Sequence, residues 1–343
     1  MSRRSTRSKF SLFRRIHFSK WLITAALILF CLIVVGSCSR YEPSQIAAIR
    51  LDYAYYNPVS LVLKDKGWLE SEFAKDKIKV EWVLSLGSNK ALQFLNSSSV
   101  DFGSTAGAAA LLGRANGNPI KSIYVYSKPE WTALVTRADS KITKVTDLKG
   151  KRVVATRGTD PYIFLLRALE QSGLSERDIE LIQLQHPEGK IALERGEVDA
   201  WAGLDPYMAQ TEIEKGSRLF FRNKSFNSYG ILNVREDFAR QHSDYVKRVL
   251  EVYEQARQWC VAHPAELKQV LVQKAKLTDA VAAKQLERTD LSNPIIGQEQ
   301  ETTIKASGDV LIKSGVIKRS INVSQVVDEL IDPKFVEQVA KKA

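Results

Sequence analysis

Cysteine is scarce in this chain, and its scarcity excludes several kinds of site. Three cysteines occur in 343 residues, namely Cys31, Cys38 and Cys260. Cys31 lies within a long apolar run and Cys38 just after it, so Cys260 is the single thiol of the rest of the chain. One thiol can form neither an internal disulfide framework nor a CxxC metal or redox site.

The chain also has few histidines and lacks the common catalytic motifs. Its 4 histidines are scattered, and none has the spacing of HExxH or of a three-ligand metal site. GxSxG, P-loop and strand-associated GxGxxG motifs do not occur. We therefore predict no catalytic residue, no metal and no cofactor. His186 is retained as a ligand candidate because it follows a predicted strand, with a structural role in the turn as the alternative.

Acidic residues are missing from the start of the chain. None occurs before Glu42, whereas residues 1–37 carry seven basic residues: Arg3, Arg4, Arg7, Lys9, Arg14, Arg15 and Lys20. Without these seven charges the net charge of +11 falls to +4. Because the basic character belongs mostly to this leader, we predict no nucleic-acid partner.

The leader has the parts of a bacterial export signal. The apolar run from Trp21 to Gly36 follows the basic segment, and small residues and Cys38 come next. Val35-Gly36-Ser37-Cys38 is similar to a lipobox, which predicts a signal peptide over 1–37, lipidation at Cys38 and a tether over 38–47. An uncleaved membrane helix and cleavage to a soluble protein are the alternatives. All three place the body outside the cytoplasmic membrane.

The body alternates short apolar strands with amphipathic helices, which predicts an α/β fold with largely parallel sheets. The order of elements repeats about a hundred residues later. Leu95, Val100 and Asp101 recur at the same spacing as Leu193, Val198 and Asp199. We therefore expect two similar lobes and a structural role for Asp199. The predicted strands cover 49–55, 78–85, 100–103, 151–157 and 179–185.

Two further predicted strands, 132–140 and 228–237, are expected to cross between the lobes as paired hinge strands. Lobe I then consists of 48–135 and 230–335, and lobe II of 136–229. The end of lobe I is predicted to be helical, with a final helix near 324–330. No low-complexity linker interrupts the body.

Four loops lead from predicted strands into helices and combine Gly or Pro with small polar residues. They cover 55–58, 86–89, 104–107 and 158–161. Helix N-termini carry partial positive charge and free N–H groups, so such loops suit a small oxyanion. Ordinary turns and helix caps are the alternative for each loop. Aromatic side chains near the ends of predicted strands suggest a pocket lined by their rings. The alternative is that these side chains pack in the core. The candidates from these loops and rings are Tyr56, Asn57, Ser88, Asn89, Thr105, Gly107, Thr159, Asp160, Trp201 and Tyr207.

Two segments resemble a known family. They are DLKGKRVVATRGTDPYIFLLRALEQSGL (147–174) and ALERGEVDAWAGLDPYMAQTE (192–212). They resemble the periplasmic aliphatic-sulfonate-binding proteins of ABC transporters, which are relatives of taurine- and nitrate-binding proteins. The resemblance covers about 49–335. It implies a monomeric two-lobed type II periplasmic-binding-protein fold, each lobe a mostly parallel sheet flanked by helices, that closes on a small organic anion and delivers it to a membrane permease.

Two further residues are candidates at the cleft. Asp205 has no counterpart in the first lobe, and the family pattern places it at the cleft; Arg288 is a candidate counter-charge. The chain departs from the family at Ala54, where a glutamine is common, and at 106–110, where a GD-x-PP run is common. The ligand is therefore open among sulfonate, taurine, nitrate and other anions. An enzyme on the same fold, as in thiamine-pyrimidine synthases, is the alternative and needs a reactive Cys or His in the cleft.

Overall fold

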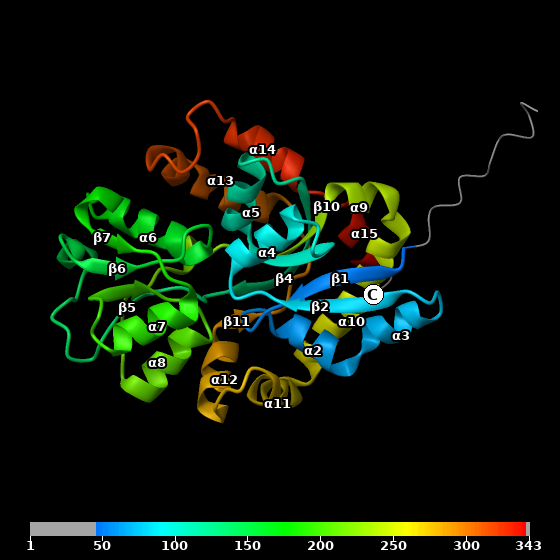
Figure 1. Cartoon of the computed structure of the whole chain (residues 1–343), viewed down its shortest axis with the longest axis horizontal. Helices are drawn as coiled ribbons and strands as arrows, with labels where there is room; N and C mark the ends of the chain where they lie inside the picture. Colours follow the sequence, from blue (N-terminus) through cyan, green and yellow to red (C-terminus); the bar gives the residue numbers. More distant parts are fainter. Residues whose placement is uncertain (1–45, 341–343) are drawn as a thin grey trace, which may run out of the picture. The chain divides into compact units, whose positions relative to one another are not determined.

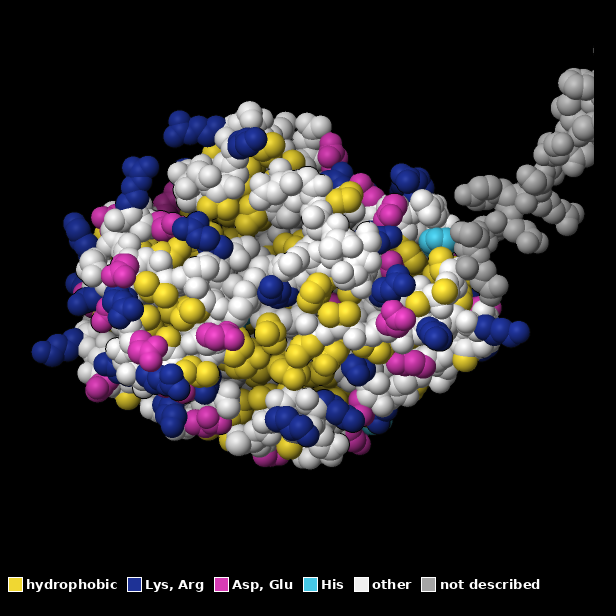
Figure 2. Space-filling view, viewed as in Figure 1, with side chains coloured by type: hydrophobic (Ala, Val, Ile, Leu, Met, Phe, Trp, Pro, Cys, Tyr) yellow, Lys and Arg dark blue, Asp and Glu magenta, His cyan; other side chains and the backbone are white. Residues whose placement is uncertain are grey.

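The computed structural model describes residues 46–340 of the chain (Figure 1). The predicted signal peptide, the lipidation site Cys38 and most of the predicted tether lie outside these residues. Within 46–340, no helix combines the length and apolarity needed to cross a membrane. On the face shown in Figure 2, Lys and Arg side chains are interspersed with Asp and Glu.

The first sheet has six strands in the order β11-β4-β10-β3-β1-β2. Strands β2, β1 and β3 are parallel, and β10, β4 and β11 extend them in antiparallel pairing. The strands are β1 (Ala48–Tyr53), β2 (Lys79–Leu84), β3 (Phe102–Ala106), β4 (Ile120–Pro129), β10 (Gly230–Arg235) and β11 (Thr289–Asp290).

The second sheet has five strands in the order β7-β6-β8-β5-β9. Strands β7, β6 and β8 are parallel, and β5 is antiparallel to both of its neighbours. The fold class predicted from the sequence is confirmed, with one difference: both sheets are mixed, because the strands next to the lobe crossings run antiparallel. The strands are β5 (Leu134–Thr136), β6 (Arg152–Val154), β7 (Glu180–Ile182), β8 (Ala200–Ala202) and β9 (Arg218–Phe221).

Helices flank both sheets (Figure 1). Around the second sheet, Val153 and Ala200 belong to the main core cluster with residues of α6, whereas Val154 and Trp201 belong to a separate cluster with residues of α7 and α8. The helices of this lobe are α6 (Asp160–Gln171), α7 (His186–Glu194) and α8 (Tyr207–Lys215), with 3-10 turns η1 (Val145–Leu148), η2 (Glu176–Asp178) and η3 (Lys224–Phe226).

The helices of the first lobe come from both ends of the body. They are α2 (Pro58–Lys66), α3 (Trp68–Ala74), α4 (Ser88–Asn96), α5 (Gly107–Ala115), α9 (Glu236–Gln241), α10 (Ser243–Ala262), α11 (Pro264–Lys274), α12 (Asp279–Glu287), α13 (Gln298–Lys313), α14 (Val323–Leu330) and α15 (Lys334–Ala340). The helix predicted near 324–330 is present as α14, but it is not the last helix, because α15 follows it. Helix α13 was also missed: it is rich in polar residues, and Gly308 lets it pack closely on Val323.

The chain crosses between the sheets twice, through residues 130–133 and 222–229, and side chains join the two crossings. The amide of Thr132 donates to Asn227 Oδ1 at 2.9 Å, and Asn227 Nδ2 donates back to Thr132 O at 3.5 Å. Arg222 donates to both carboxylate oxygens of Glu130, each at 2.9 Å. Apart from η3, both crossings are irregular backbone, so side-chain contacts rather than strand pairing hold them together.

The predicted repeat is visible as a pair of equivalent carboxylate contacts. The amide of Arg50 donates to Asp101 Oδ2, and the amide of Arg152 donates to Asp199 Oδ2, each at 2.8 Å. In return, the Asp101 and Asp199 amides donate to Arg50 O and Arg152 O at 2.8 and 2.9 Å. Each aspartate therefore ties the segment before the third strand of its lobe to the first strand. The structural role predicted for Asp199 is confirmed.

Candidate functional site

Helix N-termini from the two lobes meet at one place. A Cβ built on Gly87, just before α4, would lie 2.9 Å from Asn89 Oδ1 and 3.1 Å from His186 Nε2 at the start of α7. A Cβ built on Gly158, just before α6, would lie 3.3 Å from Asn89 Cβ. The starts of α4, α6 and α7 therefore converge, and their positive dipole ends face a common region. This is the environment in which proteins hold small anions.

The three converging helices lack the usual side-chain caps. The N-cap residues Gly87, Thr159 and Gln185 make no side-chain cap hydrogen bond. The Thr159 hydroxyl instead donates to Thr156 O at 2.6 Å. Since the first amides of a helix have no partner within the helix, these first turns keep donors for another acceptor.

Helix α5 differs from these three. The amide of Gly107 donates to Tyr229 O at 2.9 Å, and the amide of Ala108 donates to Ser228 Oγ at 3.1 Å. The segment that leads into β10 therefore accepts hydrogen bonds from the amides of the first turn of α5. The candidate Gly107 lies at this occupied turn.

His186 is a buried, neutral side chain at the contact between the lobes. Its exposed fraction is 0%, and burial lowers the pKa of its imidazole to about 3. Its Nδ1 lies 3.4 Å from Thr156 Oγ1. Its Nε2, like Asn89 Oδ1, is buried and has no hydrogen-bond partner among residues 46–340.

Asp205 and Arg288 form a buried ion pair. Arg288 Nη1 lies 3.4 Å from Asp205 Oδ1, and Arg288 Nη2 also donates to Glu212 on α8. Asp205 Oδ1 accepts from the amide of Ala209 at 2.9 Å and so supports the first turn of α8. Burial raises the pKa of Asp205 to about 7, although the Arg288 charge acts to lower it. The Arg288 guanidinium is thus paired with two carboxylates. It is not the free counter-charge for the ligand that the sequence suggested.

Several candidates in the first lobe form an internal hydrogen-bond network. The Tyr56 hydroxyl donates to Ser104 O at 2.8 Å, and Asn57 Nδ2 donates to Ser104 Oγ at 2.8 Å. Thr105 Oγ1 accepts from Asn233 Nδ2 at 2.8 Å. Ser88 Oγ accepts from the amide of Ala106 at 3.0 Å. These contacts fix the loops that follow β1, β2 and β3 relative to one another.

Asp160 connects the second lobe to both crossings. Its Oδ2 accepts from Trp131 Nε1 at 2.9 Å and from the amide of Ser228 at 3.0 Å, and its Oδ1 accepts from Ser228 Oγ at 2.7 Å. Burial raises the pKa of its carboxyl group, against these hydrogen bonds. The carboxylate is thereby fixed at the hinge.

The two ring candidates of the second lobe differ in exposure. Trp201 lies on β8 in the core cluster with Val135 and Met208, and its ring nitrogen faces Gly189 of α7. Tyr207 begins α8 and is partly buried, and burial followed by the charge of Tyr55 raises its pKa to about 12.

Comparison with known proteins places the chain in a family. A model of the family described as NMT1/THI5 like matches residues 59–267, more than half of the chain. The chain belongs to the NMT1/THI5-like family.

Two relatives match this chain over much of its length. A protein of Bacillus subtilis strain 168, named as an aliphatic sulfonates-binding protein, is 29% identical over 323 residues, covering 93% of this chain and 97% of its own length. A protein of the same name from Escherichia coli K12 is 28% identical over 227 residues, covering 66% and 70%.

A solved structure also shows the fold. The alkanesulfonate-binding protein SsuA of Xanthomonas axonopodis pv. citri, bound to MOPS, has a TM-score of 0.75 and 23% identity, covering 84% of this chain and 99% of that one. These relatives are all named as binding proteins.

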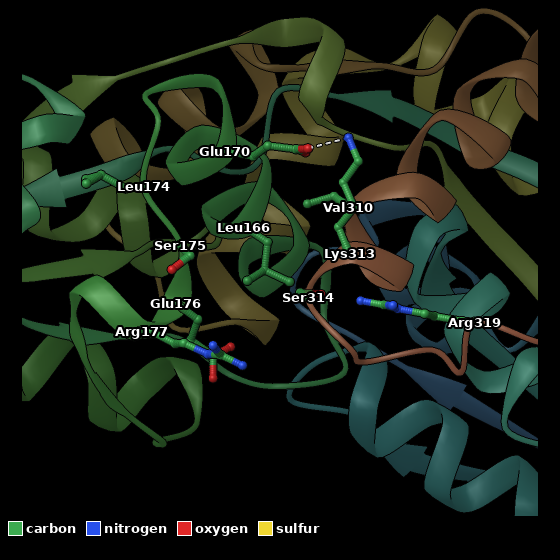
Figure 3. A pocket seen from close by; sticks show the side chains of 10 residues that line it. All are labelled: Leu166, Glu170, Leu174, Ser175, Glu176, Arg177, Val310, Lys313, Ser314 and Arg319. Carbon is green, nitrogen blue, oxygen red and sulfur yellow. Dashed lines mark hydrogen bonds and ion pairs between the residues drawn. The ribbon is translucent and has the colours of Figure 1, made fainter.

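A separate cavity of about 460 Å³ lies between the C-terminal part of α6 and the end of α13 (Figure 3). The ion pair between Lys313 and Glu170, at 2.6 Å, joins its two sides. None of the candidates from the sequence lines it. Its charged lining is mixed: Arg177, Lys313 and Arg319 lie beside Glu170 and Glu176. The start of α6 is the better candidate site because helix N-termini from both lobes meet there.

The sequence missed residues that act through distant contacts. Thr156, Ser228 and Asn227 position the site and the hinge, although Thr156 lies about seventy residues away from the other two in the sequence. Gly87 lies within a loop chosen from the sequence, but its contact with His186 depends on the meeting of the lobes. No local pattern marks such residues. Among residues 46–340, no cluster of three or more His, Cys, Asp or Glu side chains is arranged to hold a metal.

Proposed function

We propose that this protein is the extracytoplasmic solute-binding component of an ABC importer, which captures an aliphatic sulfonate or a similar small organic anion and delivers it to a membrane permease. The observation that carries the proposal is the meeting of three helix N-termini without side-chain caps, drawn from both lobes. The sulfonate-binding names of the relatives support the choice of ligand class. The basic leader and Cys38 support export with a lipid anchor.

The mechanism in this proposal is closure of the lobes about the two crossings, with 48–135 and 230–335 as lobe I and 136–229 as lobe II. A ligand held by the start of α4 from one lobe and by α6 and α7 from the other contacts both lobes only when they are closed. Such differential contact is the condition for a ligand to shift a conformational equilibrium. The Asn227 and Asp160 contacts keep the crossings ordered during the motion.

The enzyme alternative has weaker support from the side chains. Cys260 is buried on α10, and burial raises the pKa of its thiol to about 12, so it carries no thiolate at neutral pH. His186 is fully buried and neutral. Neither residue is placed as an activated nucleophile.

A thermal-shift screen tests the proposed function. The full-length protein is heated with linear alkanesulfonates, taurine, nitrate, sulfate or a thiamine pyrimidine precursor. A ligand that binds only the folded state raises the Tm with concentration. We expect at least one sulfonate to raise it at lower concentration than sulfate or nitrate. A shift with the pyrimidine alone would support the enzyme alternative, and no shift with any sulfonate would contradict the proposal.

A pair of glycine variants tests the location of the site. Gly87 and Gly297 both precede helices and have extended φ angles, 169° and −171°, so alanine fits either backbone. A Cβ at Gly87 would lie 3.1 Å from the buried His186 ring, whereas a Cβ at Gly297 meets no atom within 4 Å. We expect Gly87→Ala to weaken sulfonate binding about 10-fold or more through overpacking of the closed state. Gly297→Ala is the control, and equal affinities of the two variants would place the ligand elsewhere.

A further inference from the structure

The feature that carries a further inference is the unpartnered acceptor on His186. The imidazole is fully buried, and its Nε2 accepts no hydrogen bond from residues 46–340. Asn89 Oδ1 from the other lobe is also buried and unpartnered. Both atoms lie about 3 Å from one point, the Cβ position of Gly87. Two polar atoms from opposite lobes therefore face the same small region at the helix N-termini.

The hydrogen bonds around His186 determine which ring nitrogen carries the proton. The hydroxyl of Thr156 has one proton and donates it to Leu184 O at 2.7 Å. Thr156 Oγ1 can then only accept from His186, so Nδ1, 3.4 Å away, carries the proton. In a neutral imidazole the other nitrogen is an acceptor. Nε2 therefore presents a lone pair, not a proton, to the region between the lobes.

A buried acceptor without a donor is unfavourable, and buried polar groups are almost always paired. The donors at this site are backbone amides of α4, α6 and α7, which suit the anionic end of a ligand. A sulfonate group is ionised at neutral pH and offers no proton to Nε2. Another part of the ligand has to provide the donor when the lobes close.

We infer that the preferred ligand carries, besides its anionic group, an N–H or O–H donor that hydrogen-bonds to His186 Nε2 in the closed state. This inference rests on the proposed function and makes it more specific: the protein selects hydroxy- or amino-substituted sulfonates over plain alkanesulfonates. His186 is the residue that determines this specificity, and Thr156 is a positioning residue that acts through its hydrogen bond to Nδ1.

Calorimetric titration of the full-length protein with three matched sulfonates tests the inference. The ligands are 2-hydroxyethanesulfonate, 2-aminoethanesulfonate and 1-propanesulfonate, which share the anionic group and the number of non-hydrogen atoms. We expect at least one donor-bearing ligand to bind about 10-fold or more tightly than 1-propanesulfonate, because an analogue lacking the donor leaves Nε2 unpaired. Equal or tighter binding of 1-propanesulfonate would overturn the inference and leave the proposed function intact. Binding of no sulfonate would overturn both.

Two variants assign the preference to His186. His186→Leu removes the acceptor and should reduce the affinity ratio between donor-bearing and plain sulfonates to about 1. Thr156→Val keeps the shape of the side chain, releases Nδ1 from its partner and should also lower the ratio. The ratio does not depend on a general loss of folded protein, so it remains informative if one variant is unstable. His263→Leu, at the start of α11, is the control. An unchanged ratio in both site variants would contradict the inference.

Discussion

Burial shifts the pKa values of two ionisable side chains in the direction that disfavours their charged forms where the lobes meet. It raises the pKa of Asp205 to about 7 and lowers the pKa of His186 to about 3. In both cases the largest cause is desolvation, which disfavours the charged form. The positive potential for an anion then comes from backbone amides and helix dipoles rather than from a formal charge. A site of this kind does not need the free guanidinium that the sequence suggested at Arg288.

The pH dependence of stability tests the burial of His186. Its pKa is about 3 in the folded state and 6.5 for the free side chain, so between these values the unfolded chain binds more protons. The stability associated with neutral His186 is complete above pH 6.5 and decreases as the pH falls towards 3. We expect wild type to lose about 2–3 kcal/mol more free energy of unfolding than His186→Leu between pH 7 and pH 4. Urea denaturation at several pH values measures this, and parallel curves for the two proteins would show that the imidazole is not buried as described.

Among the secondary-structure elements, the repeated strand-helix-strand unit was predictable and the long-range contacts were not. The Leu-Val-Asp spacing identified Asp101 and Asp199 as equivalent, and both carboxylates make the same contact. The sequence of strand β4 does not alternate clearly between apolar and polar residues, because side chains on both faces of this strand are mostly buried.

At the candidate site too, local patterns could be predicted from the sequence and long-range contacts could not. The loops before α4 and α6 were chosen as ligand-binding candidates because a helix N-terminus after a strand is a local pattern, and the structure brings these two loops together. The occupation of the first turn of α5 by Ser228 and Tyr229 was not predictable, because these residues lie more than 100 positions away in the sequence. Which N-terminus stays free is decided by the tertiary structure.

The carboxylate contacts of the two lobes give a prediction about stability. Asp101→Ala removes an acceptor from the Arg50 amide inside the first lobe, where Asp101 is 3% exposed. We expect it to lower the free energy of unfolding by about 1–3 kcal/mol. Asp139→Ala is the control, because this exposed aspartate forms only a surface pair with Arg137. Equal midpoints for the two variants in urea denaturation would show that the contact contributes little.

For the body as a whole, the contacts between the lobes fall into two groups with different roles. The hinge contacts of Asn227, Asp160 and Glu130 lie at the crossings and keep the lobes connected. Lys313 with Glu170 joins helices away from the crossings. Arg288 with Asp205 and Glu212 lies beside the first crossing, where the amide of Glu130 donates to Arg288 O at 2.8 Å. The exposed Lys313 pair contributes little, as surface ion pairs generally do. A ligand that adds contacts at α4, α6 and α7 therefore stabilises the closed arrangement.

Hydrogen exchange measured by mass spectrometry, with and without a saturating sulfonate from the thermal-shift screen, tests the central claim most directly. Amides that a bound ligand orders or covers exchange more slowly. We expect slower exchange in peptides from both lobes at once, covering 86–92 in the first and 156–163 and 185–190 in the second. Protection confined to one lobe, or centred on the cavity between α6 and α13, would contradict capture of the anion between the lobes.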